Sequence, residues 1–283
     1  MNIMMAGDPR SLEAEKPDIT VEAAFGTIVV EGTRRTMEHH VRPGECPCLA
    51  PVSEVPFDGK IGISHVDLDT VGGCGAAMGR KPGTPTFWEL AALVDVTGPH
   101  NPEVRKHPNY PELLAYWAWS QRLENRAPLV GTGGGVLDVT NLVGRCLNAV
   151  EQIFQEDPHG PLHQAGQDFK DYEAQLAEES LVAVVPKGDI AVAIRSSEHF
   201  VNHLYTLSSG MVVGAIVAYN TEKKSVTLSF KDCAARGKRN AADIMRRVFG
   251  PEAGGHPGIA ERISADEEQA YTERDCDRVV ALL

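Results

Sequence analysis

The sequence has no apolar run long enough to span a bilayer, and its first residues, Met-Asn-Ile-Met-Met-Ala-Gly-Asp, lack a basic region followed by an apolar one. Cysteine is also scarce. Six cysteines spread over 283 residues do not form a disulfide framework, which indicates reduced thiols. We therefore expect a cytoplasmic protein with no membrane segment.

Positive charge is in short supply as well. The chain has 27 lysine and arginine residues against 39 aspartates and glutamates, which gives a formal net charge of -12. This balance argues against long nucleic acid or an anionic membrane as a partner. It does not exclude a small anionic substrate, because bound cations can reverse the sign of the charge at a site. A homo-oligomer is left open.

The stretch from Ile61 to Gly75 carries the densest set of chemically useful side chains. Its first half alternates like a strand, and its glycine-rich second half predicts a tight turn leading into a helix. If the strand continues to Asp69, its period of two places His65, Asp67 and Asp69 on one face. A divalent cation would stabilise these three groups together. The alternative is a solvated strand end with a helix cap.

The segment before this stretch contains two adjacent histidines and two cysteines. Residues 1–18 are polar, and we expect them to be loosely ordered. His39 and His40 cannot both point inward from a regular strand, so we expect at most one of them to reach a central site as an additional ligand. Cys46 and Cys48 lack the spacing of a zinc knuckle, and no second pair follows. We therefore interpret them as loop cysteines rather than a structural zinc site.

Three further candidates follow apolar or glycine-rich segments. The apolar run from Phe87 to Val96 predicts a helix that leads into a buried strand end, and Asp95 and His100 lie where it gives way to a turn. Asp138 follows a glycine-rich loop that does not match a phosphate-binding Walker sequence. For each carboxylate the alternative is a turn residue that accepts backbone hydrogen bonds.

The predicted fold class is α/β. We expect a catalytic domain with a parallel sheet over residues 1–156, a polar connector over 157–180, and a smaller α+β domain over 181–283, with a cleft between the two domains. In the smaller domain the pattern predicts strands at 181–185, 190–194, 211–219 and 225–230, and helices at 199–207 and 240–249.

A glycine pair followed by histidine stands out in the tail. Gly254 and Gly255 would let the backbone approach a ligand closely and offer amide hydrogens to an anion. His256 would add a proton or a hydrogen bond. A structural turn is the alternative.

Together these pieces resemble the DHH phosphoesterase superfamily. The tail, with Val226-Thr-Leu-Ser-Phe-Lys231, a helix and Gly254-Gly-His-Pro-Gly-Ile-Ala260, resembles its DHH-associated domain. The upstream half resembles its catalytic motifs: His65, Asp67 and Asp69 the first, Asp95 the second, His100 the third, and Gly135-Val-Leu-Asp138-Val-Thr140 the fourth. The third motif of the superfamily reads Asp-His-His, whereas His100 lies in Gly-Pro-His-Asn.

The resemblance implies a manganese-dependent hydrolase of a small phosphorylated molecule or short nucleotide. Two metal ions would lower the pKa of a bridging water, and the resulting hydroxide would attack phosphorus. The implied metal ligands are His65, Asp67, Asp69, Asp95, His100 and Asp138. The implied catalytic residues are Asp95, His100 and His256, and the implied substrate contacts are Gly254, Gly255, His256 and Lys231.

Manganese is the metal that an oxygen and imidazole ligand set favours, with iron, cobalt and magnesium left open. Two alternatives for the function also remain open. One is a bimetal hydrolase that cleaves a non-phosphate bond. The other is a non-catalytic ligand-binding protein that keeps the fold and a degenerate site.

Overall fold

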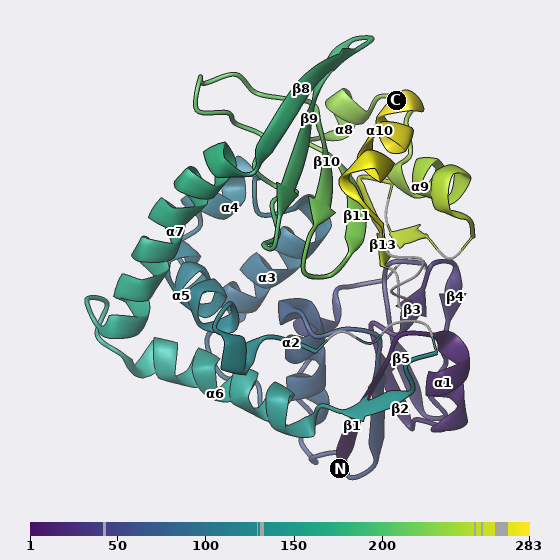
Figure 1. Ribbon diagram of the computed structural model, residues 1–283. Helices are drawn as coiled ribbons and strands as arrows, with labels where there is room; N and C mark the ends of the chain where they lie inside the picture. Colours follow the sequence, from purple (N-terminus) through teal and green to yellow (C-terminus); the bar gives the residue numbers. More distant parts are fainter. Residues whose placement is uncertain (42–43, 129, 131–132, 252, 256, 264–270) are drawn as a thin grey trace. The chain divides into compact units, whose positions relative to one another are not determined.

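A computed structural model describes residues 1–41, 44–128, 130, 133–251, 253–255, 257–263 and 271–283 (Figure 1). The chain divides into two compact units, Met1–Asp171 and Tyr172–Leu283. The division falls inside helix α7 (Pro161–Glu179), which takes up most of the predicted connector. No helix in the described part of the chain is both long and apolar enough to cross a membrane.

The first unit contains a five-stranded sheet in the order β5-β2-β6-β1-β7. Its strands are β1 (Asn2–Ala6), β2 (Ile19–Val21), β5 (Arg35–Met37), β6 (Lys60–Ile63) and β7 (Val136–Asp138). The first four pair in parallel, and β7 runs antiparallel to β1. The α/β prediction with parallel strands is therefore confirmed for this unit, although the sheet is mixed.

Strand β1 corrects the expectation that residues 1–18 are loosely ordered. Ile3 and Met5 are buried on one face of the sheet, and Ala6 is buried on the other. The sequence of β1 does not alternate between apolar and polar residues, because Met4 on the second face is also apolar. Such continuous apolar runs are typical of strands that are covered on both faces.

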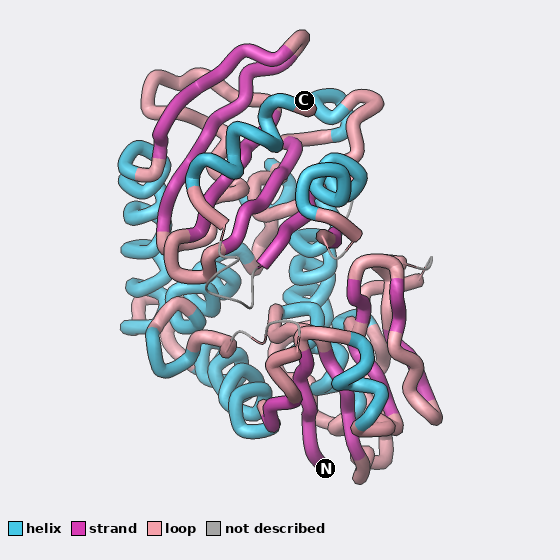
Figure 2. Tube along the Cα trace, turned by 45° about the vertical axis from the view of Figure 1, so that its right-hand side comes forward, coloured by secondary structure: helices cyan, strands magenta, loops and turns pink. Residues whose placement is uncertain are grey.

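Helices cover both faces of this sheet (Figures 1 and 2). Leu12 on α1 (Pro9–Ala14) packs with Ala6 on one face. The larger layer on the other face shares the core of Ile3 and Ile63, and it contains α2 (Leu68–Ala77), α3 (Pro85–Thr97), α4 (Pro102–Lys106), α5 (Tyr110–Ser120) and α6 (Thr140–Gln155). Shorter elements are the hairpin β3 (Ala24–Phe25) and β4 (Ile28–Val29), and the 3-10 turns η1 (Pro47–Leu49) and η2 (Leu123–Asn125).

The second unit is built on a six-stranded sheet in the order β12-β13-β11-β10-β9-β8. Its strands are β8 (Leu181–Lys187), β9 (Ile190–Ser197), β10 (Ala215–Asn220), β11 (Ser225–Phe230), β12 (Gly254–Gly255) and β13 (Ile259–Ile263). Its helices are α8 (Cys233–Arg236), α9 (Ala241–Phe249) and α10 (Glu273–Ala281). The four predicted strands and the predicted helix at 240–249 are confirmed, except that the strand predicted over 211–219 begins only at Ala215.

The helix predicted over 199–207 is wrong. This segment consists of turns, and its apolar side chains, among them Val201 and Leu204, still pack in the core. The carbonyl of Leu204 accepts a hydrogen bond from the buried guanidinium of Arg195 at 2.7 Å. A tertiary contact therefore takes the place of helical hydrogen bonding, which a local pattern does not reveal.

Candidate metal centre

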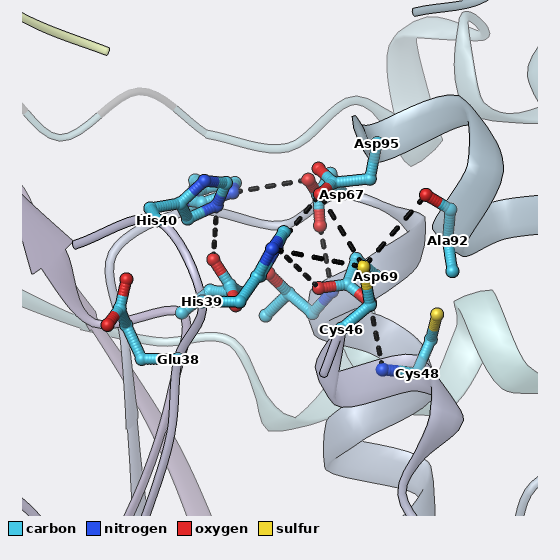
Figure 3. Close-up of polar contacts among 12 residues, drawn as sticks. Glu38, His39, His40, Cys46, Cys48, Asp67, Asp69, Ala92 and Asp95 are labelled. Atoms are coloured by element: carbon cyan, nitrogen blue, oxygen red, sulfur yellow. Dashed lines mark hydrogen bonds and ion pairs between the residues drawn. The ribbon is translucent and has the colours of Figure 1, made fainter. Parts of the chain in front are cut away.

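Polar side chains gather at the carboxyl ends of three adjacent parallel strands of the first unit. Glu22 follows β2, His39 and His40 follow β5, and His65 follows β6. Because β5, β2 and β6 are neighbours in the sheet, their carboxyl ends meet at one edge, where α/β folds bind ligands. We call Glu22, His39, His40, Cys46, Asp69 and Asp95 the edge cluster (Figure 3).

Glu22 has a strained backbone and a fully buried carboxylate. Its φ of 49° lies in the left-handed region that a non-glycine residue seldom occupies. Its Oε1 lies 3.7 Å from Nε2 of His39, and its Oε2 contacts Nε2 of His40. Among the described residues, no hydrogen bond of regular geometry reaches either oxygen. Strain and an unsatisfied buried carboxylate at one position indicate a site built for a ligand.

His39 and His40 both reach the cluster, so the prediction that at most one would do so is wrong. Strand β5 ends at Met37, and alternation of side chains applies only within a strand. Glu38 is turned away from the cluster (Figure 3) and accepts the backbone N–H of Val41 at 2.6 Å. This bond closes the turn on which the two imidazole rings lie 4.4 Å apart, centroid to centroid.

Helix α2 supplies Asp69, and its start corrects the predicted strand. The strand ends at Ile63, and Asp67 is the N-cap of α2, accepting the N–H of Thr70 at 2.8 Å. His65, Asp67 and Asp69 are therefore brought close by a loop and a helix turn rather than by a strand face. An aspartate N-cap followed by an acid in the first turn is favoured at any helix start. The Asp-x-Asp spacing alone therefore did not distinguish a helix start from a strand end.

The carboxylate of Asp69 is buried and half satisfied. Its Oδ1 accepts the N–H of Cys48 at 2.8 Å, and its Oδ2 lies 3.7 Å from Nε2 of His39 without a hydrogen-bond partner in the described part of the chain. Burial, and next the negative charge of Asp67, raise the pKa of Asp69 to about 7. The site disfavours this negative charge until a cation or a proton neutralises it.

Asp95 approaches from the last turn of α3, where the apolar run stays helical and does not lead into a strand. Its Oδ2 lies 2.9 Å from Nε2 of His39 and 3.9 Å from Sγ of Cys46. The hydrogen bond to Asp95, and next the contact with Cys46, raise the pKa of His39 to about 11.

His65 and Asp67 form a more exposed pair beside the cluster. Nε2 of His65 lies 3.2 Å from Oδ2 of Asp67, and its Nδ1 lies 2.8 Å from the hydroxyl of Ser64. The rings of His65 and His40 are 6.4 Å apart, centroid to centroid. Burial opposes protonation of His65, but the charge of Asp67 outweighs it and raises the pKa of His65 to about 9.

Four predicted ligands lie outside the edge cluster: His65 and Asp67, which lie beside it, and Asp138 and His100. Asp138 is exposed and accepts the N–H of Thr140 at 2.9 Å. It ends β7, which runs antiparallel to β1, so it pairs with Met4 in the middle of β1 and not with the carboxyl end of that strand. His100 lies half-buried in the turn after α3, against Gly98, and belongs to neither candidate ligand group found among the described residues.

The predicted substrate contacts lie in the second unit. Lys231 is paired with Asp232 at 3.0 Å. Gly254 and Gly255 form β12, and a Cβ on Gly255 would lie 2.4 Å from the carbonyl oxygen of Ile259. The hairpin itself therefore requires glycine at 255, which supports the structural alternative for that residue. His256 lies outside the described residues.

Sequence reasoning missed Glu22 and took Cys46 for a loop cysteine. The available signal for Glu22 was an acid directly after the short apolar run Ile19-Thr-Val21. Cys46 carried no such signal, because its place in the cluster depends on how its turn packs onto α2.

The edge cluster has the composition of a divalent cation site. Two overlapping groups have ligand atoms within 4.8 Å of one another: His39, Cys46, Asp69 and Asp95 form one, and Glu22, His39 and His40 form the other. Buried carboxylates so close together repel each other unless a positive charge lies between them, and His39, whose pKa is raised to about 11, supplies one when it is protonated. The donor atoms also suit a divalent cation in place of that proton. Comparisons of this chain with protein-family models and with curated proteins give no match.

Proposed function

We propose that the edge cluster binds two divalent cations and that the protein is a metal-dependent hydrolase of a small phosphorylated molecule. The observation that supports this most strongly is the pair of buried carboxylates, Glu22 and Asp69, whose unsatisfied oxygens face His39. Burying such oxygens without a hydrogen bond costs several kcal/mol in an apolar setting, and a bound cation offsets that cost.

The two groups of donors assign the residues to two positions. His39, Asp69 and Asp95 would hold one cation, and Glu22 and His40 would hold the other. His65 and Asp67, next to His40, stay candidates for the second position. The resemblance to the superfamily also makes Asp95 the candidate for a residue that bridges the two cations.

The cations, when bound, would supply Lewis acid chemistry and lower the pKa of bound water. Residues of the chain would orient the substrate and transfer protons. The negative net charge of -12 would repel a phosphorylated substrate, so the cations would attract it. Ser64 and Asp67 orient the ring of His65, which is partly exposed. If Glu22 and His40 hold the second cation without His65, this ring would be available to exchange a proton with a leaving group.

We further infer membership of the DHH phosphoesterase superfamily, with manganese as the expected metal. Glu38-His39-His40 is an acid-His-His triplet like the third motif of that superfamily, and it lies earlier in the chain than His100. Its two histidines point into the cluster, which supports the inference. We expect a cytoplasmic protein, in keeping with six free cysteines.

The test is metal analysis together with an activity screen. The full chain is stripped with a chelator, reloaded with Mn²⁺, and assayed for bound metal and for hydrolysis of a panel of phosphoesters. We expect close to two ions per chain and Mn²⁺-dependent release of phosphate. Asp95→Asn is expected to lose both, whereas the exposed Asp138→Asn retains them.

Two other results would change the proposal. Bound metal without turnover of any phosphoester would favour the hydrolase of another bond or the non-catalytic binder. Absence of bound manganese, iron, cobalt or zinc at neutral pH would contradict a metal centre altogether.

A further inference from the structure

The turn that carries Cys46 packs very closely on helix α2. A Cβ on Gly72 would lie 2.5 Å from the Cβ of Cys48, and one on Gly73 would lie 2.6 Å from the Cβ of Pro47. No side chain fits at these distances without displacement of the turn. The two glycines lie inside α2 and allow this turn to pack closely on the helix. They do not form the tight turn that was predicted to precede a helix.

Polar contacts fix the turn in the same place. The ammonium of Lys81 donates to the carbonyl oxygens of Cys48 at 2.9 Å and Ala50 at 2.6 Å. The N–H of Cys48 donates to Oδ1 of Asp69. The turn is thus tied to Asp69, a member of the edge cluster, on one side and to Lys81 on the other.

The result is that Cys46, and not Cys48, faces the ionisable groups. Sγ of Cys46 is buried and lies 3.9 Å from Nδ1 of His39 and 3.9 Å from Oδ2 of Asp95 (Figure 3). Sγ of Cys48 donates instead to the carbonyl oxygen of Trp88 at 3.3 Å. Two cysteines of one turn therefore have different surroundings, one beside a cation site and the other in the core.

The spacing of the donor atoms fits a shared cation. For metal–sulfur and metal–oxygen bonds of about 2.3 and 2.1 Å, the sulfur and oxygen of one tetrahedral centre lie about 3.6 Å apart. The separation of 3.9 Å between Cys46 and Asp95 is close to this value. Asp69 provides an independent observation, because its buried Oδ2 has no hydrogen-bond partner among the described residues and is directed at the same group.

We propose that Cys46 is a ligand of the cation held by His39, Asp69 and Asp95, and that this position prefers a thiophilic metal such as zinc, ferrous iron or cobalt. The thiol proton passes to solvent as the sulfur–metal bond forms. A thiolate selects such metals over manganese, whereas the position at Glu22 and His40 has only oxygen and nitrogen donors. The two positions therefore differ in metal preference. This inference rests on the proposed function, since it requires a cation in the edge cluster.

Cobalt(II) is the probe that tests it, because cobalt bound to a thiolate has a charge-transfer band in the near ultraviolet. The metal-free full chain is titrated with Co²⁺ while its absorption spectrum is recorded. We expect the band in the wild type, its loss in Cys46→Ser, and its retention in Cys48→Ala, which removes the neighbouring thiol. The affinity of Cys46→Ser for Zn²⁺ should be about tenfold lower or more. Mutation of residues that only hydrogen-bond to a metal ligand already lowers metal affinity by that factor.

A second measurement needs no variant. X-ray absorption at the zinc edge of the zinc-loaded wild type should show a sulfur neighbour at about 2.3 Å. Bound cobalt without a charge-transfer band, or zinc without sulfur, would overturn Cys46 as a ligand and leave the proposed function intact. Failure to bind cobalt, zinc or manganese would overturn both.

Discussion

Each unit of this protein buries charged side chains, and the two units satisfy them to different degrees. In the second unit, the fully buried guanidinium of Arg195 donates to the carbonyls of Ala177 at 2.5 Å and Leu204 at 2.7 Å, and to the hydroxyl of Ser180 at 2.9 Å, so that among the described residues only its Nε lacks a partner. In the first unit, the buried carboxylates of Glu22 and Asp69 retain oxygens that accept no hydrogen bond within the described residues.

The difference separates a structural charge from charges that we propose to be functional. Arg195 ties β9 to α7 and to the turns after β9, so its charge supports the fold. Glu22 and Asp69 destabilise the metal-free protein, since each of these buried carboxylates has an unsatisfied oxygen. A protein can retain such an unfavourable free energy at a site where a bound ligand offsets it. A cation in the edge cluster would offset it here.

Asp69→Asn should have the largest effect. We expect its affinity for Mn²⁺ to fall by more than about a hundredfold, because it removes a ligand and one negative charge. The asparagine carbonyl can still accept the N–H of Cys48, so the metal-free variant should be at least as stable as the wild type. Isothermal titration with Mn²⁺ and urea denaturation measure the two effects, with Asp138→Asn as the control. A variant that binds Mn²⁺ normally would remove Asp69 from the site.

Arg195→Met should show the reverse behaviour. It leaves three buried acceptors without their donor, and we expect a loss of about 3 kcal/mol in the free energy of unfolding, with Mn²⁺ binding unchanged. Arg246→Met, which breaks a pair with Asp243 on α9 that is partly open to solvent, should cost under about 1 kcal/mol. Urea denaturation compares the two. Equal losses would mean that burial of Arg195 does not matter for stability.

The glycines of α2 test how the turn of Cys46 and Cys48 is held. Gly72→Ala should cost about 2 kcal/mol through overpacking against Cys48, despite the better helix propensity of alanine. Gly144→Ala on α6, where a Cβ meets nothing within 4 Å, should stabilise the protein by up to about 1 kcal/mol. Thermal unfolding measures both. Stabilisation by Gly72→Ala would show that the close approach is not required.

The stabilisation by a bound metal ion is also expected to depend on pH. The pKa of Asp69 is raised to about 7, so in the metal-free protein this group weakens stability as pH rises from about 4 to 7. The pKa of His39 is raised to about 11, so its favourable contribution is complete below about 6.5 and is lost as pH rises toward 11.

A cation replaces the proton of Asp69 and also the proton of His39, so the gain in stability on adding Mn²⁺ should increase between pH 5 and 7, by at most about 2.7 kcal/mol per pH unit for two protons. Tm measured with and without Mn²⁺ at several pH values checks this. Asp69→Asn should remove the share that belongs to Asp69, and an unchanged dependence in that variant would assign it to other groups.

The sequence was sufficient for much of the fold but for only part of the candidate site. The strands at 181–185, 190–194 and 225–230 were predicted correctly because these short runs are rich in β-branched and other apolar residues. Asp69 and Asp95 were predicted as ligands, and both lie in the edge cluster. Their elements were wrong, since helices and not strands carry both residues.

The remaining differences arise from information that is not local. The direction of β7 within the sheet decides where Asp138 lies, and no residue of β7 encodes that direction. The turn after β5 allows His39 and His40 to point together, and it depends on the contact between Glu38 and Val41. Cys46 enters the site only through the packing of its turn on α2.

Anomalous diffraction from crystals soaked in Mn²⁺ tests the central claim most directly, because it locates the ion without any assay. We predict a peak among His39, Asp69 and Asp95 and a second peak at Glu22 and His40. Manganese that is absent from both places, with the two buried carboxylates unchanged, would contradict the account.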